Sequence, residues 1–221
     1  MRIQEVTLDN IVDLNHKVKS IELCFKDDYM RHKPGQYLKI HYKDGKEYCY
    51  SIADVNMNNK FQLHISVNRN NEFSDYLNNK AKPGDVLNVS GPYGELYKRE
   101  RDCKEVVYVA EGTGFASIKS IIESSLKDDT RQSLFWYNKD KNGIYMEDKL
   151  KKWKNEYCNF SYKILNEAED KVEYITNSVV EQHKKLSECV VYVCGSQNLN
   201  KYMKTNLVMN GLNSTDYYTE I

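Results

Sequence analysis

The chain has 221 residues, a length that allows two modest domains or one large domain. It carries 32 basic and 32 acidic residues, so it lacks the basic excess with which nucleic-acid-binding proteins neutralise phosphates. The six cysteines include no Cys-x-x-Cys pair, the histidines show no paired metal spacing, and no run approaches the roughly 18 apolar residues of a membrane span. We therefore expect a reduced, cytoplasmic protein with no nucleic-acid partner, no membrane partner, no bound metal and no iron–sulfur cluster.

The first hundred residues alternate short apolar runs with dense turn signals such as Lys33-Pro34-Gly35. One interruption, residues 72–79, is predicted to be helical because Phe73, Tyr76 and Leu77 share a face. Six strands at this spacing predict a small antiparallel β-barrel of the Greek-key type. The expected strands are residues 3–8, 18–25, 37–42, 48–53, 61–67 and 86–89.

A domain boundary is expected shortly after the barrel. Gly91-Pro92-Tyr93-Gly94 closes the first half, and residues 98–104 are charged and lack apolar anchors. We therefore predict one domain over residues 1–101 and a second over residues 102–221.

The second half begins with a strand, a glycine turn and a helix start in immediate succession. Residues 106–109 form an unbroken β-branched and aromatic run, typical of a parallel strand covered on both faces. Gly112 and Gly114 permit a tight reversal, and apolar residues at helical spacing follow from Phe115 onward. The free N–H groups and dipole of a helix that begins near Thr113 favour a phosphate. Taken alone, Gly-Thr-Gly fits a plain structural turn equally well.

A second copy of the same pattern strengthens the phosphate interpretation. Residues 189–196 repeat the Val-Val-Tyr-Val strand, end in the glycine turn at Gly195, and lead into apolar residues at helical spacing. Two such units place two glycine turns at the carboxyl edge of one sheet, where open α/β sheets bind ligands. The second half is therefore predicted to be a doubly wound, parallel-sheet nucleotide-binding domain.

The order of these motifs resembles the ferredoxin–NADP reductase superfamily. Within it, the chain is similar to the short branch without an iron–sulfur domain, which includes NAD(P)H:flavin reductases and reductases of CDP-6-deoxy-glucoseen intermediates. The resemblance covers nearly the whole chain, and the ordered set is specific although each motif alone is not. The seven motifs are Lys33-Pro34-Gly35-Gln36-Tyr37, Tyr50-Ser51, Lys82-Pro83-Gly84-Asp85, Gly91-Pro92-Tyr93-Gly94, Gly112-Thr113-Gly114-Phe115-Ala116, Cys194-Gly195-Ser196 and Asp216-Tyr217-Tyr218.

The resemblance implies a flavin ring in the cleft between barrel and sheet. Tyr50 would pack on the ring, and the Ser51 hydroxyl would lie near its N5. Cys194 would lie near the nicotinamide carbon that gives up hydride, so Ser51 and Cys194 are the expected catalytic residues. The expected cofactors are FAD, or FMN or riboflavin as an exchangeable substrate, together with NADH or NADPH. The expected cofactor-binding residues are Tyr50, Ser51, Ile52, Arg69, Ser74, Gly112, Thr113, Gly114, Lys139, Cys194, Gly195 and Tyr218.

Two of these residues have a purely structural alternative. Cys194 fits a buried structural thiol, because cysteine is among the most buried residue types. Tyr218 fits a simple packing residue as well as an aromatic side chain that gates nicotinamide access.

The flavin-phosphate region departs from the family pattern. Tyr48 stands where the family has an arginine, and the loss of a bidentate guanidinium weakens phosphate binding more than ring binding. Arg69 either replaces the missing charge or is a solvated loop arginine. Asn71 stands where a glycine is common, a mild change because asparagine tolerates positive φ. These changes favour a flavin held mainly by its ring.

The nucleotide region departs from the pattern as well. Glu111 places a carboxylate at the mouth of the first glycine turn, so either it points away or dinucleotide affinity is reduced. Ser117 replaces a frequent proline, and a small polar residue there is expected to be harmless. Lys139 stands where the family has an arginine that meets the 2′-phosphate of NADP. It is either a point charge for that phosphate or an ordinary loop lysine, which leaves the choice between NADH and NADPH open.

Two functions follow from these observations. The first is a flavin-dependent oxidoreductase that takes hydride from NAD(P)H and passes electrons to free flavin or to a separate iron–sulfur or oxygenase partner protein. The second is a catalytically degenerate binding module of the same fold, favoured by Tyr48 and Glu111. His64 is either a proton donor or a residue of the barrel surface or lining.

Overall fold

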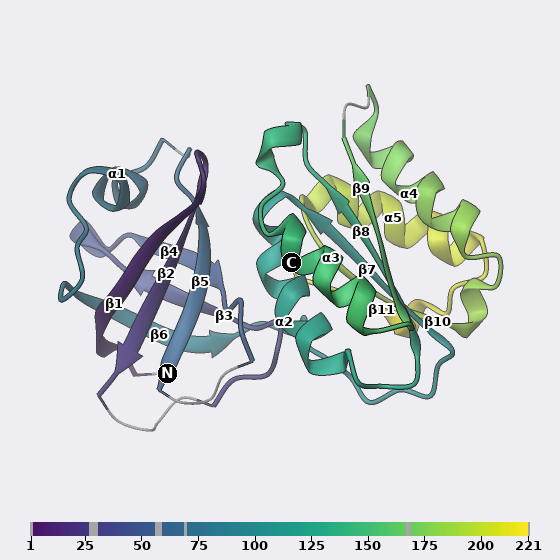
Figure 1. Ribbon diagram of the computed structural model, residues 1–221, viewed down its shortest axis with the longest axis horizontal. Coiled ribbons are helices and arrows are strands. Elements are labelled where there is room, and N and C mark those ends of the chain that lie inside the picture. Colours follow the sequence, from purple (N-terminus) through teal and green to yellow (C-terminus); the bar gives the residue numbers. More distant parts are fainter. Residues whose placement is uncertain (1, 27–30, 56–58, 69, 167–168, 221) are drawn as a thin grey trace.

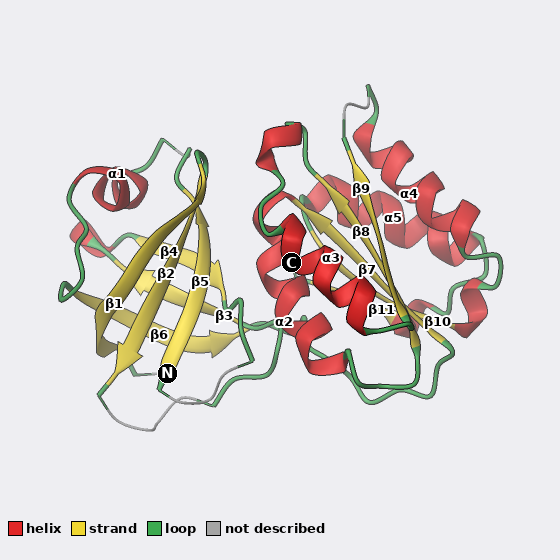
Figure 2. Ribbon diagram, in the orientation of Figure 1, coloured by secondary structure: helices red, strands yellow, loops and turns green. Residues whose placement is uncertain are grey.

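The computed structural model describes residues 2–26, 31–55, 59–68, 70–166 and 169–220 (Figure 1). A β-barrel stands beside a second sheet that carries helices on both faces (Figure 2). None of the helices in these ranges is long and apolar enough to cross a bilayer. This arrangement confirms the predicted combination of an antiparallel barrel and a parallel α/β sheet.

The barrel contains six antiparallel strands in the order β4-β3-β6-β1-β2-β5. Its open edge is closed by a bridge between Ile52 and Leu63 and by the Ala53 N–H, which donates to the Gln62 carbonyl at 2.7 Å. The first strand continues to Asn15, well beyond the predicted residues 3–8, because its polar end still pairs with the second strand. The strands are β1 (Gln4–Asn15), β2 (Val18–Phe25), β3 (Tyr37–His41), β4 (Glu47–Ser51), β5 (Lys60–Ser66) and β6 (Val86–Tyr93).

One helix, α1 (Glu72–Asn79), packs against the barrel and has the predicted bounds. Phe73 and Leu77 enter the barrel core, at 0% and 2% exposure. The Asn71 side chain caps the helix by accepting a hydrogen bond from the Ser74 N–H at 2.9 Å. The cap therefore satisfies one of the free donors of this helix start.

The second sheet is wholly parallel, in the order β11-β10-β7-β8-β9. The chain adds strands to one side of β7 and then returns to its other side with β10. This reversal places the topological switch point between β7 and β10, the position at which such sheets bind ligands. The strands are β7 (Glu105–Glu111), β8 (Arg131–Tyr137), β9 (Phe160–Leu165), β10 (Cys189–Cys194) and β11 (Tyr217–Thr219).

Two pairs of helices cover the two faces of this sheet. The first pair, α2 (Phe115–Ser125) and α3 (Glu147–Glu156), shares a buried cluster with one face. The second pair, α4 (Lys171–Gln182) and α5 (Gln197–Met209), packs on the other face. Helix α2 also faces the barrel (Figure 1). Short 3₁₀ turns span Lys43–Gly45, Gly112–Gly114, Lys141–Gly143, Leu186–Glu188 and Ser214–Asp216.

The connection between barrel and sheet runs from the end of β6 at Tyr93 to the start of β7 at Glu105. The boundary that we expect between residues 101 and 102 falls inside this connection. Its position stays a prediction.

Candidate functional site

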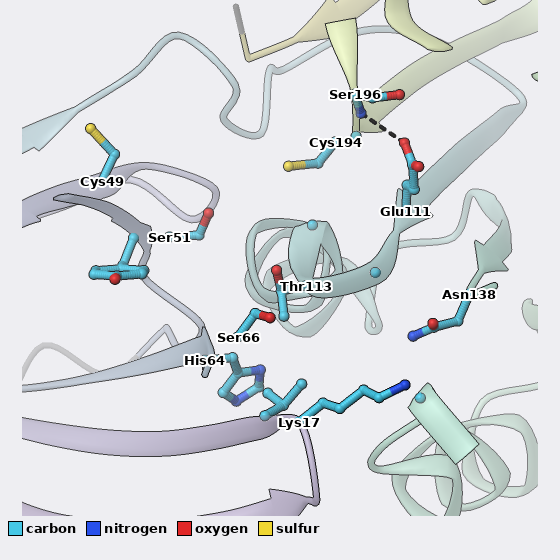
Figure 3. A pocket seen from close by; sticks show the side chains of 16 residues that line it. Lys17, Cys49, Ser51, His64, Ser66, Glu111, Thr113, Asn138, Cys194 and Ser196 are labelled. Carbon is cyan, nitrogen blue, oxygen red and sulfur yellow. Dashed lines mark hydrogen bonds between the residues drawn. The ribbon is translucent and has the colours of Figure 1, made fainter. Parts of the chain in front are cut away.

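A cleft of about 510 Å³ lies between the barrel and the carboxyl edge of the parallel sheet (Figure 3). Its volume is in the range of small-molecule sites in proteins. Both halves of the chain contribute to it, which places the two predicted nucleotide turns opposite the end of β4. It is lined by Lys17, Val18, Cys49, Tyr50, Ser51, His64, Ser66, Glu111, Gly112, Thr113, Gly114, Asn138, Gly143, Cys194, Gly195 and Ser196.

The barrel wall of the cleft is formed by the end of β4. Tyr50 is buried and packs against Phe73 with ring centroids 5.7 Å apart, whereas Ser51 is turned toward the second sheet. The Ser117 Oγ donates a 2.7 Å hydrogen bond to the Ser51 Oγ, so the expected catalytic hydroxyl is held by the first turn of α2. Ile52 belongs to the fully buried barrel core and does not line the cleft.

The two glycine turns form the opposite wall. Gly112 adopts φ +57°, and its carbonyl accepts a 3.0 Å hydrogen bond from the Trp136 indole N–H. A Cβ at Gly114 would stand 2.2 Å from the Cys194 carbonyl oxygen, so only glycine lets the turn before α2 come this close to the end of β10. The predicted convergence of Gly112, Gly114 and Cys194 at one sheet edge is therefore present in the fold.

The Cys194 thiol is protonated at physiological pH. Burial raises its pKa to about 11; a hydrogen bond with Ser117 opposes this rise, and the negative charges of Glu220 and Glu111 add to it. A thiolate nucleophile is thus disfavoured here. The side chain offers a neutral sulfur and a weak S–H donor at the cleft wall.

Glu111 does not point away from the cleft. One carboxylate oxygen accepts a 2.8 Å hydrogen bond from the Ser196 N–H, and the other pairs with the Lys171 ammonium. Burial raises the pKa of Glu111, but these partners outweigh it and hold the pKa below its usual value. A charged carboxylate therefore occupies a backbone donor at the start of α5, where a phosphate oxygen would otherwise bind.

Several predicted cofactor residues lie outside the cleft lining. Lys139 is exposed, and its neighbour Asn138 lines the cleft instead. Tyr218 stacks on Tyr192 with centroids 5.2 Å apart, and its hydroxyl accepts a 3.0 Å hydrogen bond from Arg101. The geometry of Tyr218 matches the packing alternative, and its gating role stays a prediction.

Two further predicted residues concern the flavin phosphate. Ser74 is fully buried, and its hydroxyl has no hydrogen-bond partner among the described residues. Arg69 lies outside the described residues.

The expected phosphate end of the flavin is rich in aromatic side chains. Tyr48, which replaces the family arginine, stacks on Phe73 with centroids 5.7 Å apart at 23°. At the start of α1, Glu72 pairs with Lys46 at 2.7 Å, and Asn71 already satisfies one backbone donor. These residues give a phosphate less support than a guanidinium would, whereas the hydroxyl-lined cleft suits a flat polar ring.

Three residues that approach the site were missed by the sequence analysis. The Ser117 hydroxyl, expected only to be harmless, holds Ser51 in place. Lys17, at the turn between β1 and β2, lines the cleft and pairs with Asp140 at 2.6 Å. Glu220 follows β11; burial raises its pKa, and its charge reaches Cys194. Only Glu220 had a sequence signal, an acidic residue close behind the matched Asp216-Tyr217-Tyr218 motif.

The fold also groups Glu105, His183 and Cys189, whose potential metal-ligand atoms lie within 4.8 Å of one another. Histidine spacing gave no sign of this group. His183 is already bonded to Glu105 at 2.6 Å, and Arg131 pairs with the same carboxylate at 2.5 Å. Because β7 and β10 begin here, the group is at the sheet edge opposite the cleft.

Family models match both halves of the chain. An oxidoreductase FAD-binding domain matches residues 5–97, and an oxidoreductase NAD-binding domain matches residues 108–205. The first match covers the barrel and α1. The second covers the glycine turns and most of the parallel sheet.

Three curated relatives are 27% or 28% identical to the chain. Reductase component 2 of terephthalate 1,2-dioxygenase from Comamonas sp is 27% identical over 196 residues, covering 85% of this chain and 58% of the relative. CDP-6-deoxy-L-threo-D-glycero-4-hexulose-3-dehydrase reductase from Yersinia pestis is 28% identical, covering 84% and 58%. A probable flavin reductase from Vibrio harveyi is 28% identical, covering 76% and 77%. The chain thus spans less than two thirds of the first two relatives.

The fold is also found among solved structures. A ferredoxin NADP⁺ reductase from Neisseria gonorrhoeae with bound FAD and NADP superposes with a TM-score of 0.86 at 16% identity. The superposition covers 100% of this chain and 98% of that one. At this identity the likeness establishes the fold.

Proposed function

We propose that the chain, whose two halves match oxidoreductase FAD-binding and NAD-binding domains, is a member of the ferredoxin–NADP reductase superfamily that takes hydride from NADH or NADPH onto a flavin and passes the electrons onward. The observation that carries the proposal is the convergence of Ser51 with the glycine turns at Gly112 and Gly195 on one cleft. A barrel wall for a flavin thereby faces a sheet edge suited to a dinucleotide.

The residues of the cleft fit these two groups. A flavin, when bound, supplies the capacity to accept a hydride and to release electrons one or two at a time. Ser51 directs a hydroxyl into the cleft, and Ser117 fixes its orientation. The glycine turns would hold a bound dinucleotide at the wall opposite Ser51, and such positioning can supply several kcal/mol of barrier reduction. Neutral Cys194 lies in the same wall as these turns, at the end of β10, and leaves the proton balance of the cleft unchanged.

The flavin is proposed to exchange with solvent more readily than in relatives that hold its phosphate with arginine. Two observations support this proposal. Tyr48 stacks on Phe73, and the Asn71 side chain already accepts a hydrogen bond from the Ser74 N–H at the start of α1. Riboflavin, FMN and FAD would then differ little in affinity, because the ring provides most of the contacts.

The electron acceptor is proposed to be free flavin or a separate iron–sulfur or oxygenase partner protein. The names of the relatives support both routes, since one is a probable flavin reductase and another is the reductase component of a dioxygenase. A cytoplasmic location is part of the same proposal. It is supported by six cysteines that are all free, as expected in a reducing compartment.

An anaerobic visible absorption spectrum tests the proposal. The purified protein is examined alone, after addition of flavin, and after addition of NADH or NADPH. A copurifying flavin band that bleaches with one nucleotide would establish a bound-flavin reductase and name its donor, whereas bleaching of added flavin only would indicate a flavin that exchanges as a substrate. Absence of both flavin binding and bleaching would contradict the proposal.

The second candidate is a binding module of the same fold without efficient turnover. The Glu111 carboxylate, which reaches the Ser196 N–H at the second glycine turn, favours it, because a like charge there opposes a pyrophosphate. In the same experiment this candidate predicts flavin binding without bleaching by either nucleotide.

A further inference from the structure

His64 lies on β5, at the wall that the barrel presents to the second sheet, and it lines the cleft (Figure 3). Its side chain is only 2% exposed, yet neither ring nitrogen has a hydrogen-bond partner among the described residues. Buried polar atoms in proteins are nearly always satisfied, because an unpaired one costs about 1–3 kcal/mol. His64 lines the cleft while both nitrogens lie beneath its surface, so they leave a hydrogen-bond donor and an acceptor for a ligand that reaches them.

The surroundings of His64 determine its chemical form. The Tyr145 ring meets it edge-on, with centroids 5.3 Å apart, so an apolar face covers the imidazole. Burial, and then the positive charges of Lys119 and Lys149, lower the pKa of His64 to about 3. The ring is therefore neutral at physiological pH and offers one N–H donor and one nitrogen acceptor. A neutral imidazole suits a neutral ligand group better than a phosphate.

Neighbouring side chains indicate which group this is. Ser66 lies two residues after His64 on β5, so the two side chains share a face of the strand, and Ser66 also lines the cleft. Ser51 ends strand β4, which meets β5 where the barrel closes. All three belong to the part of the chain that matches the FAD-binding domain. The polar edge of a flavin ring carries an imide, in which one N–H donor stands between two carbonyl acceptors. A nitrogen acceptor with the Ser66 hydroxyl on the same face of β5 complements the N–H and one of the carbonyls of that pattern.

We propose that His64 recognises the imide edge of the flavin ring, with an imidazole nitrogen that accepts the hydrogen bond from the flavin N3–H. This inference rests on the proposed function, since it requires a flavin in the cleft. Ser66 supplies a donor to an adjoining carbonyl. His64 is thus a binding residue for the ring and takes no part in proton transfer.

The test compares riboflavin with 3-methylriboflavin, in which a methyl group replaces the N3 hydrogen, by anaerobic fluorescence titration of the wild-type protein and variants. We expect wild type to bind the methylated ring about tenfold more weakly, the equivalent of one lost hydrogen bond in a buried site. His64→Leu should weaken riboflavin binding about tenfold and remove most of the discrimination. His64→Gln, whose amide oxygen can accept the same hydrogen bond, should restore part of both.

His41→Leu is the matched control. His41 is a partly buried histidine of β3 that bonds the Ser90 hydroxyl at 2.7 Å and lies outside the cleft lining. Its replacement should leave both affinities unchanged. Circular dichroism of each variant distinguishes lost binding from lost folding.

Three outcomes would overturn the inference. Equal discrimination in wild type and His64→Leu would mean that the methyl group is excluded by shape alone. Loss of NADH affinity with unchanged riboflavin affinity in His64→Leu would assign His64 to the nicotinamide carboxamide. If wild type binds neither riboflavin nor its methyl derivative, the proposed function itself fails. The first two outcomes leave flavin binding intact, so the two kinds of failure are distinguishable.

Discussion

The Ser117 Oγ donates a 2.7 Å hydrogen bond to the Ser51 Oγ and joins the first turn of α2 to the end of β4. A hydroxyl that accepts one hydrogen bond keeps its own proton free to donate elsewhere. For Ser51 the free direction is the cleft that its side chain lines. The contact therefore connects the two domains and sets the direction in which Ser51 donates.

Ser51→Ala should slow flavin reduction by NAD(P)H by about 10-fold to 100-fold, because a positioned donor beside a developing charge is worth at least that much. Ser117→Ala should slow it less, by severalfold, since the Ser51 hydroxyl remains but rotates freely. Stopped-flow absorbance at saturating nucleotide measures both. Ser120→Ala is the control, since Ser120 is equally buried on α2 and its hydroxyl donates to the Ser117 carbonyl. An unchanged rate in Ser51→Ala would remove Ser51 from the assigned role.

Glu111→Gln should tighten NADH and NADPH binding by roughly threefold to tenfold. The glutamine oxygen can still accept from the Ser196 N–H, whereas the negative charge near a pyrophosphate is gone. The effect is modest because Lys171 already neutralises much of that charge. Glu111→Gly, which also frees the Ser196 N–H, should tighten binding further.

Isothermal titration calorimetry at two salt concentrations measures the Glu111 effect. The gain should shrink at high salt, because screening reduces charge repulsion. Glu173→Gln provides the control, as Glu173 is exposed in the first turn of α4. Equal nucleotide affinities in wild type and both Glu111 variants would show that the nucleotide binds without approaching Ser196.

The parts of the site that could be predicted from the sequence are those fixed by local backbone geometry. Gly112, Gly114 and Gly195 each follow a strand that is buried on both faces, so the switch-point rule brings their turns together. The residues that were missed depend on how the barrel meets the sheet. Ser51 and Ser117 are 66 residues apart, and no periodicity in either segment reports that contact.

Side-chain direction was the second limit. The position of Glu111 at the end of β7 was evident, but its partner Lys171 lies 60 residues away at the start of α4, so the sequence left the direction of the Glu111 side chain open. His64 and Ser66 occupy alternate positions on one face of β5, a pattern found both in exposed strands and in strands that line a barrel. The packing of Tyr145 against the His64 ring, which helps to bury it, joins two distant parts of the chain and has no sequence signal.

Lys119→Met should destabilise the protein by about 2–4 kcal/mol, the cost of leaving buried polar groups unpaired. Lys119 is 2% exposed, and its ammonium donates to the Ala53 carbonyl at 2.6 Å and to Glu123 at 2.9 Å. Loss of the Ala53 contact removes a bond between α2 and the barrel. Urea unfolding should therefore show a lower midpoint and a separation of barrel and sheet transitions.

The control for Lys119 is Lys152→Met on the exposed surface of α3, which should change stability by less than about 0.5 kcal/mol. Equal losses in the two variants would mean that the buried ammonium adds nothing specific. Glu123 keeps Lys149 as a partner in the Lys119 variant, so its charge stays compensated.

Asp54→Asn should stabilise the protein above pH 6 and have little effect near pH 4. Burial raises the pKa of Asp54 to about 6; the Gln62 N–H and the charge of Lys119 oppose the rise, and Glu123 and Glu22 add to it. One carboxylate oxygen accepts from the Gln62 N–H at 3.2 Å, and the other is buried without a partner among the described residues. Asparagine can keep the first bond without carrying a charge.

The sign follows from proton linkage. Unfolded aspartate has a pKa of about 3.9, so between roughly pH 4 and pH 6 the folded state binds more protons than the unfolded state. The contribution of Asp54 to the free energy of unfolding therefore falls as pH rises through that window and is constant above it. Each pKa unit is worth about 1.4 kcal/mol, so the advantage of Asp54→Asn should grow to at most about 3 kcal/mol. Guanidinium unfolding at several pH values measures this difference, with Asp148→Asn, at an exposed position, as the control. A gain in the free energy of unfolding that does not vary with pH would assign the effect of Asp54→Asn to packing instead of charge.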